Sequence, residues 1–137
     1  MCVLSVIPPE GPAPPVLCGE NSGQHMYTSL NGALEGCVLI NLYISAAPAT
    51  RRFSVRARQT VCGSGPPDGC LQWFEGVTGT VQSFNEGGQR THLAGQQYTV
   101  CVRRQRAHCS ICWAADTFQV RNGRSRLGFG FGRRRRY

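Results

Sequence analysis

Glycine and proline interrupt this chain so often that little room is left for a long helix. The 137 residues include 17 glycines and 8 prolines, and both residue types favour turns over the interior of regular elements. No window of eleven or more residues shows the apolar spacing of an amphipathic helix. Short apolar or alternating runs lie between the turns. The sequence therefore predicts an all-β fold built from short strands.

Several of these runs are predicted to be strands from their composition alone. Residues 2–7 are apolar, and the run PPEGPAPP that follows is expected to be a loop because proline has no amide donor for a sheet. Residues 37–44 are apolar on both faces, which predicts a strand in the middle of a sandwich. Further strands are expected at 24–30, 97–103, 109–114 and 118–120.

The clearest alternation in the chain extends from residue 51 to residue 62. A period of two places one set of side chains on a core and the other set in water. The apolar set is Phe53, Val55, Ala57 and Val61, and the arginines of the other set are Arg52, Arg56 and Arg58. Spaced arginines on a strand are ordinarily its solvated face, so we expect that role for them rather than a binding stripe.

A glycine- and proline-rich bend at residues 63–69 separates this run from a second series of strands. The series begins with residues 70–74 and 79–85. Gly76 and Gly79 flank the turn between these two runs, which predicts a β-hairpin. The change of pattern across the bend also predicts a domain boundary there.

The basic charge of the chain is concentrated in its last seventeen residues. The formal net charge is +8. Residues 121–137 hold seven arginines and no acids, whereas residues 1–120 hold eight arginines against seven acids and are nearly neutral. The tail has no alternation and cannot build a core, so we expect residues 121–137 to be disordered.

Four consecutive arginines near the end of the tail admit three interpretations. They are Arg133, Arg134, Arg135 and Arg136. In a secreted chain they would form a processing site, and in an intracellular chain a segment that binds nucleic acid or directs nuclear import. The third interpretation is a terminus without a role.

Eight cysteines in 137 residues favour an oxidising, extracellular compartment. The C-x-x-C pair, Cys109 and Cys112, lacks a second pair of ligands at comparable spacing, so disulfides or buried thiols are expected rather than zinc or redox chemistry. Spacing leaves the connectivity open, with Cys62–Cys70 and Cys101–Cys109 as local alternatives. The disulfide candidates are Cys18, Cys62, Cys70, Cys101, Cys109 and Cys112.

Neither catalysis nor a membrane span is indicated by the sequence. The histidines His25, His92 and His108 do not adjoin a nucleophile motif, and the seven acids form no close pair. We therefore expect no enzyme, no cofactor and no metal. The longest apolar run, residues 38–44, is too short to span a bilayer. The N-terminus also lacks the features of a signal peptide, from which we expect the chain to be a fragment.

Two strings after the bend carry a family resemblance. GCLQWFEGVTGTVQSFN and HLAGQQYTVCVRRQRAHCSICWAADTFQV resemble the CUB-like domains of secreted arthropod proteins. The first cysteine of the CUB pattern would be Cys70, followed by the strand at 79–85, and Tyr98 would precede the second cysteine, Cys101. Upstream, residues 17–62 resemble the closing strands of such a domain.

The resemblance implies a jelly-roll β-sandwich that is extracellular and non-catalytic, and that recognises a protein or glycan. It implies the disulfide Cys70–Cys101. Glu75 and Asp116 are the acids roughly placed for the calcium site of some CUB domains, but the loop that would complete the site is missing, and we expect no calcium.

The resemblance also implies that the sandwich is partial or permuted. Residues 1–62 would be the closing half of one CUB-like unit, 63–69 a linker, 70–120 the opening half of the next unit, and 121–137 the basic tail. Together the halves hold about a full set of strands, so they could pack into one sandwich in permuted order.

Two functions are therefore weighed for the chain. The first is an extracellular recognition module, and the alternative is a nucleic-acid-binding protein that acts through its arginine-rich tail. Deleting the tail distinguishes them, because the alternative predicts a salt-dependent binding that is lost with residues 121–137.

Overall fold

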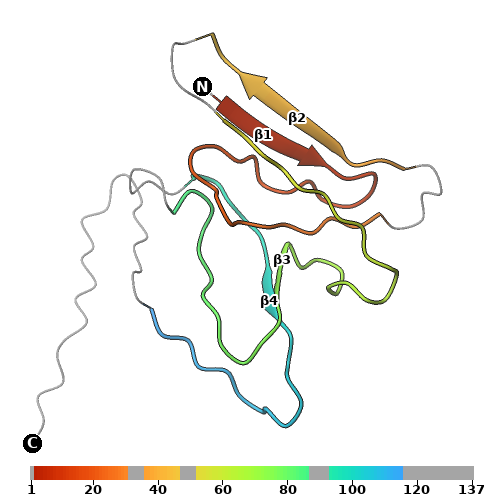
Figure 1. Cartoon of the computed structure of the whole chain (residues 1–137), viewed down its shortest axis with the longest axis vertical. Helices are drawn as coiled ribbons and strands as arrows, with labels where there is room; N and C mark the ends of the chain where they lie inside the picture. Colours follow the sequence, from red (N-terminus) through yellow and green to blue (C-terminus); the bar gives the residue numbers. More distant parts are fainter. Residues whose placement is uncertain (1, 31–35, 47–51, 87–92, 116–137) are drawn as a thin grey trace, which may run out of the picture. The chain divides into compact units, whose positions relative to one another are not determined.

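The computed structural model describes residues 2–30, 36–46, 52–86 and 93–115. Its elements are four strands: β1 (Cys2–Ile7), β2 (Leu39–Ile44), β3 (Gln72–Phe74) and β4 (Val100–Val102) (Figure 1). Within these ranges no residue is helical, and none of the described segments is a helix long and apolar enough to cross a membrane. The predicted all-β class is confirmed. The jelly-roll order of the strands stays a prediction.

The chain divides into two units. Residues Met1–Ala107 form the first and residues His108–Tyr137 the second. Of the second unit, residues 108–115 are described, and they contain no strand. The strand predicted at 109–114 is therefore wrong, because this stretch finds no backbone partner among the described residues. The strand predicted at 118–120 and the whole basic tail, with Arg133 to Arg136, lie outside the described residues.

The first sheet joins the N-terminal strand to β2. The two strands are antiparallel, with Cys2 opposite Ile44 and Ile7 opposite Leu39. On β1, Leu4 also exchanges two backbone hydrogen bonds of 2.8 Å with Leu17, which forms an isolated bridge. β1 therefore lies between β2 and the segment that contains Leu17.

The predicted central position of residues 37–44 is wrong. β2 pairs with β1, and most of its side chains are exposed. The exposed large apolar residues of the strand are Leu39, Ile40, Tyr43 and Ile44. An apolar run indicates a strand but does not specify how many partners the strand finds, and in the described residues this one is covered on neither face.

The second sheet is a short parallel pair. Gln72 lies opposite Val100 and Phe74 opposite Val102, and the amide of Arg103 extends the ladder by donating to the Phe74 carbonyl at 2.9 Å. The predicted hairpin of 70–74 with 79–85 is wrong, because residues 79–85 form no strand. They belong instead to the long connection that a parallel pair requires.

The hydrophobic core draws on segments from both sides of the 63–69 bend. Leu17, Leu71 and Phe84 are buried at its centre, and the phenyl ring of Phe84 is fully enclosed. The ring of Tyr98 packs on that of Phe84 with centroids 5.1 Å apart. Partly buried residues complete the cluster: Leu4, Met26, Leu93 and Tyr98.

The most regular alternation in the sequence does not build this core. Residues 52–62 form no strand, and the side chains predicted to face the core are exposed. The exposed fractions of Phe53 and Val61 are 60% and 80%. Alternation shows that a segment suits a sheet, but a ladder also needs a partner strand, and none of the described segments supplies one. The prediction of a core strand here is wrong.

Residues 24–30 are a second predicted strand that the structure does not contain. The segment contacts the second sheet instead, where the amide of Tyr27 donates to the Leu71 carbonyl at 2.8 Å. A single hydrogen bond of this kind fixes the segment without making it a strand of the ladder.

Candidate functional site

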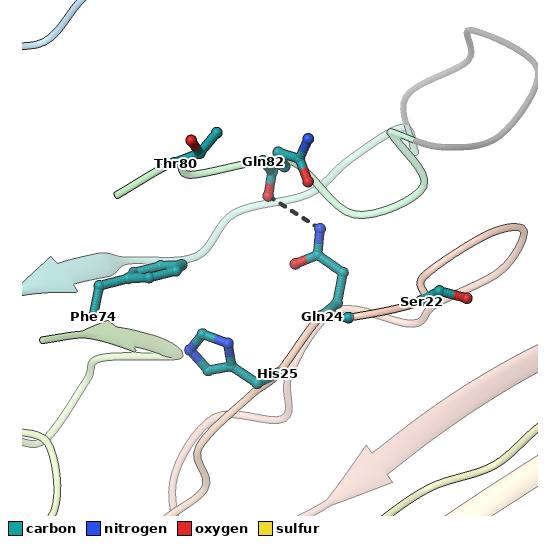
Figure 2. Close-up of a pocket in the computed structure, with 7 residues that line it drawn as sticks. Ser22, Gln24, His25, Phe74, Thr80 and Gln82 are labelled. Atoms are coloured by element: carbon teal, nitrogen blue, oxygen red, sulfur yellow. Dashed lines mark hydrogen bonds between the residues drawn. The ribbon is translucent and has the colours of Figure 1, made fainter. Parts of the chain in front are cut away.

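Three segments that are distant in sequence are joined by a chain of side-chain amides. Gln72 of β3 is fully buried, and its Nε2 donates to Gln24 Oε1 at 2.9 Å and to the His25 carbonyl at 3.3 Å. In turn, Gln24 Nε2 donates to the carbonyls of Gln82 and Ser83 at 3.5 and 3.3 Å. Figure 2 shows the bond from Gln24 to Gln82. The network is buried at Gln72 and exposed where Gln24 meets Gln82 and Ser83, and these bonds hold its members in one arrangement.

The imidazole of His25 is fixed beside this network. Its Nε2 lies 3.1 Å from the carbonyl oxygen and 3.3 Å from the amide nitrogen of Trp73. Its ring meets Phe74 edge to face, with centroids 4.9 Å apart, and Tyr27 in the same way at 5.8 Å. The backbone contacts of Nε2 and the two aromatic neighbours fix the position of the His25 ring.

A small hollow opens where these side chains meet (Figure 2). Its volume is about 120 Å³, well below the ~300 to 1,000 Å³ of typical small-molecule sites. The phenyl ring of Phe74, the imidazole of His25, amides and hydroxyls form its walls, and among the described residues no carboxylate lines it. The lining residues are Ser22, Gly23, Gln24, His25, Phe74, Thr80 and Gln82. The hollow is therefore of the size of one side chain and lacks an acid-base pair.

A pair of asparagines anchors the loop that forms one wall of the hollow. The side-chain oxygen Oδ1 of Asn85 accepts a hydrogen bond from the backbone amide of Glu20 at 2.8 Å. The backbone amide of Asn85 donates to Asn21 Oδ1 at 2.9 Å. Glu20 then holds Ser22, whose amide donates to the carboxylate at 3.0 Å and whose hydroxyl also donates to it. These bonds from Ser22, with the nearby charge of Arg52, lower the pKa of Glu20.

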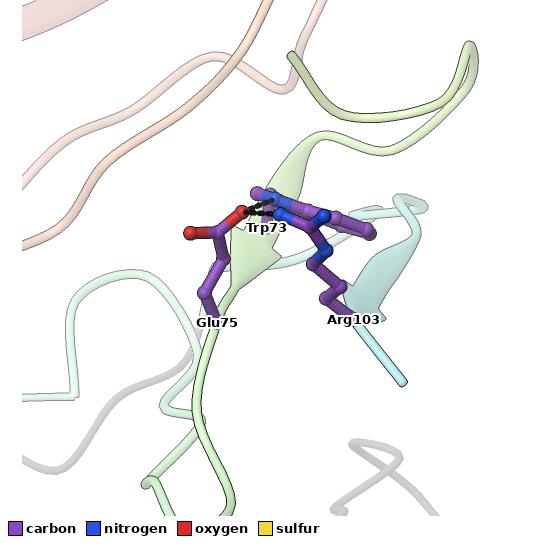
Figure 3. A network of polar contacts seen from close by, with 3 residues as sticks. All are labelled: Trp73, Glu75 and Arg103. Atoms are coloured by element: carbon purple, nitrogen blue, oxygen red, sulfur yellow. Dashed lines mark hydrogen bonds and ion pairs between the residues drawn. The ribbon is translucent and has the colours of Figure 1, made fainter. Parts of the chain in front are cut away.

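A polar triad lies on the exposed side of the second sheet (Figure 3). One oxygen of Glu75, Oε1, accepts from the Arg103 guanidinium at 2.9 Å and from the Trp73 indole at 3.2 Å. The hydrogen bond from Arg103, followed by that from Trp73, lowers the pKa of Glu75. Asp116, the other acid placed near a CUB calcium site, lies outside the described residues. Within the described ranges, no group of three metal-binding side chains is present.

The structure contains the disulfide that the CUB resemblance implied. Cys70 and Cys101 are bonded, with their Cα atoms 5.7 Å apart. The local alternatives Cys62–Cys70 and Cys101–Cys109 are therefore wrong, since each would use a cysteine of this bridge. Five further cysteines are free thiols, and all but the half-buried Cys18 are exposed: Cys18, Cys37, Cys62, Cys109 and Cys112.

The sequence did not single out the residues that organise the hollow. Gln24, Gln72 and Asn85 occur in ordinary polar contexts, and nothing in the local pattern distinguishes the buried Gln72 from the exposed Gln97. Their roles depend on partners between 47 and 65 positions away. Contacts of that separation leave no signature in a single sequence.

One comparison with known protein families found a match to part of this chain. Comparisons with curated proteins and with solved structures found nothing that matches. The family model described as "Animal CUB domain" matches residues 67–132. This region includes the Cys70–Cys101 disulfide and both strands of the second sheet. The chain therefore carries a CUB-like domain sequence over residues 67–132.

Proposed function

We propose that this protein is a non-catalytic, extracellular recognition module that binds a protein or glycan partner, with a protein as the favoured ligand. The CUB match supports this class, because CUB domains serve as extracellular interaction modules. The observation that carries the proposal is the small hollow whose walls are held by the Gln24–Gln72 amide network.

The chemistry of the hollow suits recognition. His25 and Gln24 are already engaged by the surrounding chain, so the hollow presents fixed dipoles and the ring of Phe74 rather than a reactive group. Recognition sites typically combine such an apolar surface with a few fixed polar groups. Pre-organised side chains also lose little conformational entropy when a ligand binds.

The size of the hollow favours a protein ligand. A space of about 120 Å³ takes one side chain of a partner, which would anchor a larger contact across the surrounding surface. A glycan would instead stack a sugar on the same aromatic ring. Binding to a glycan array distinguishes a glycan ligand from a protein ligand.

Filling the hollow tests the proposal. Thr80 lines the hollow, whereas Thr78 is also exposed but does not line it. We expect Thr80→Arg to lower affinity for a partner found by screening secreted proteins against the full chain by at least tenfold, and the matched Thr78→Arg to change it less than twofold. Equal effects of the two substitutions would exclude the hollow as the binding site. Binding to a glycan array, with no protein partner, would assign the glycan instead.

Removal of the basic tail distinguishes this function from the nucleic-acid alternative. A chain that ends at residue 120 should keep its affinity for the partner, because the hollow lies within residues 22–82. Loss of binding on truncation, together with a steep salt dependence in the full chain, would favour the tail as the ligand-binding segment.

A further inference from the structure

Three exposed arginines lie on a segment, residues 52–62, that packs against no core on either face in the described part of the chain. We call Arg52, Arg56 and Arg58 the arginine stripe. The sequence pattern made them the outer face of a core strand, but the inner face is also in water, since Phe53 and Val55 are 60% and 52% exposed. The alternation therefore does not bury one face of this segment. The regular spacing of the arginines is then not explained by a core on the opposite face.

The backbone presents the stripe in a line. Residues 52–62 contain no helix, and none of them has a left-handed backbone, the next left-handed residue being Gly63. In Figure 1 the yellow segment is open and nearly straight. At ~3.3 Å per residue, an extended chain separates Arg52 from Arg56 by about 13 Å and Arg56 from Arg58 by about 7 Å. Ser54 and Thr60 occupy the remaining positions of the same period.

The charge of the stripe is compensated only in part, at Arg52. Residues 52–67 contain no acid, and none of the three guanidinium groups forms an ion pair with a described residue. The charge of Arg52 contributes to the lowered pKa of Glu20, so the Glu20 carboxylate compensates part of the charge of Arg52. Neither Arg56 nor Arg58 contributes to the lowered pKa of a described carboxylate. Because residues 1–120 are nearly neutral as a whole, the stripe is a local concentration of positive charge.

We propose that the arginine stripe binds a sulfated polysaccharide. A guanidinium group donates two parallel hydrogen bonds to a tetrahedral oxyanion, and such charge-assisted bonds are stronger than neutral ones. A linear polymer that carries sulfates at intervals along its length matches cations at intervals along an extended backbone. Hydroxyl groups at Ser54 and Thr60 would donate further hydrogen bonds. None of the three arginines lines the hollow at Phe74, and the proposed ligand differs from the protein that is favoured for the hollow.

The alternation of the segment favours a sulfated glycan over a nucleic acid. Proteins that bind single-stranded nucleic acid combine a basic groove with aromatic rings on which the bases stack. The aromatic residue of this segment, Phe53, is out of phase with the arginines and so belongs to the opposite face of an extended chain. Charges without an adjacent stacking ring suit a polymer whose recognition depends on its sulfates.

Binding of a heparin dodecasaccharide to the full chain, measured by calorimetry over a range of salt concentrations, tests the proposal. The test variant is Arg52→Gln, Arg56→Gln and Arg58→Gln. The control variant is Arg133→Gln, Arg134→Gln and Arg135→Gln, which removes the same charge from the tail. We expect the test variant to bind at least tenfold more weakly and to lower the slope of log K against log salt by about two to three.

The control variant distinguishes an effect of the stripe from an effect of the total charge, because both variants remove three positive charges. We expect the tail variant to weaken binding less than threefold, and equal losses in the two variants would overturn the proposal. A single-stranded DNA of the same charge should bind more weakly than the dodecasaccharide. Tighter binding of DNA that is lost in the stripe variant would assign the surface to nucleic acid instead. Peptide mapping of Cys70–Cys101 in each variant confirms the fold.

Discussion

The side-chain amide of Asn85 occupies the space that a β-carbon at Gly19 would need. A Cβ built on Gly19 would lie 1.9 Å from Asn85 Oδ1, the same oxygen that accepts the Glu20 amide. Gly19 also has a φ of +78°, in the left-handed region that glycine adopts without strain. The close approach joins two segments 66 positions apart and positions the loop beside the hollow.

Gly19→Ala should therefore destabilise the protein more than an ordinary substitution. The left-handed backbone costs about 1 kcal/mol for alanine, and displacement of the Asn85 amide leaves a backbone N–H unpaired, so we expect a total loss of about 2 to 4 kcal/mol in urea unfolding. Gly11→Ala is the matched control, because Gly11 has a φ of +83° with no atom near its Cβ position. It should cost about 1 kcal/mol. Similar losses in both variants would contradict the contact.

Two phenylalanines in different environments give a second test. Phe84 is fully buried, whereas Phe53, the core residue that alternation predicted, is 60% exposed. We expect Phe84→Ala to cost about 3 to 5 kcal/mol of unfolding free energy and Phe53→Ala to cost less than about 0.5 kcal/mol. Chemical denaturation followed by tryptophan fluorescence measures both. A larger loss for Phe53 would show that the alternating segment is packed.

The disulfide should contribute strongly to stability. Cys70 and Cys101 are separated by 31 residues, and closing a loop of that length in the unfolded chain is worth about 3.5 to 4 kcal/mol in the chain-entropy model. The double variant Cys70→Ser, Cys101→Ser should lose about that amount. Cys62→Ser removes an exposed free thiol and should change stability by less than about 0.5 kcal/mol. Equal stabilities of the two variants in denaturant would contradict the bridge.

The Glu75–Arg103 pair predicts a small dependence of stability on pH. The pKa of Glu75 is lowered from about 4.5 in the folded state, by Arg103 first and by Trp73 second. A group whose folded pKa lies below its unfolded pKa stabilises the fold above the unfolded value, and this contribution is lost as the pH falls through the folded pKa. Wild type should therefore exceed Glu75→Gln in stability at neutral pH, and the difference should vanish in acid.

Removing the partner of Glu75 gives the reciprocal measurement. Arg103→Gln should raise the pKa of Glu75 toward its ordinary value, as followed by carboxyl NMR titration, because Arg103 is the largest cause of the shift. Both groups are more than half exposed, so water and salt screen the interaction. An unchanged Glu75 titration in Arg103→Gln would exclude the ion pair.

We propose that the segments before and after the 63–69 bend fold together as one permuted unit, and cleavage of the bend tests this. Leu17 packs in the same cluster as Leu71 and Phe84, and Cys70–Cys101 does not tether the first segment. Subtilisin cleavage within 63–69 should yield two fragments that elute together in size-exclusion chromatography without denaturant. Elution as separate fragments would show that they fold independently.

Several features of this protein follow from short-range sequence alone. Frequent glycine and proline exclude long helices, and the apolar run at 2–7 forms β1 as predicted. The sequence around Cys70 and Cys101 resembles the CUB pattern closely enough to imply their disulfide, which the structure contains. The first two features depend on local backbone preferences. The disulfide follows from a family pattern that can be recognised within a short stretch of the sequence.

Only the tertiary structure decided which of the candidate strands find partners. Phe53 and Phe84 both occur in plausible strand patterns, yet one is exposed and the other fully buried. Burial of Phe84 depends on Leu17, and the hollow depends on Gln72 reaching Gln24 across 48 positions. A pattern of period two specifies which side chains share a face, but whether that face is covered depends on the contacts between distant segments, and these are made only when the chain folds.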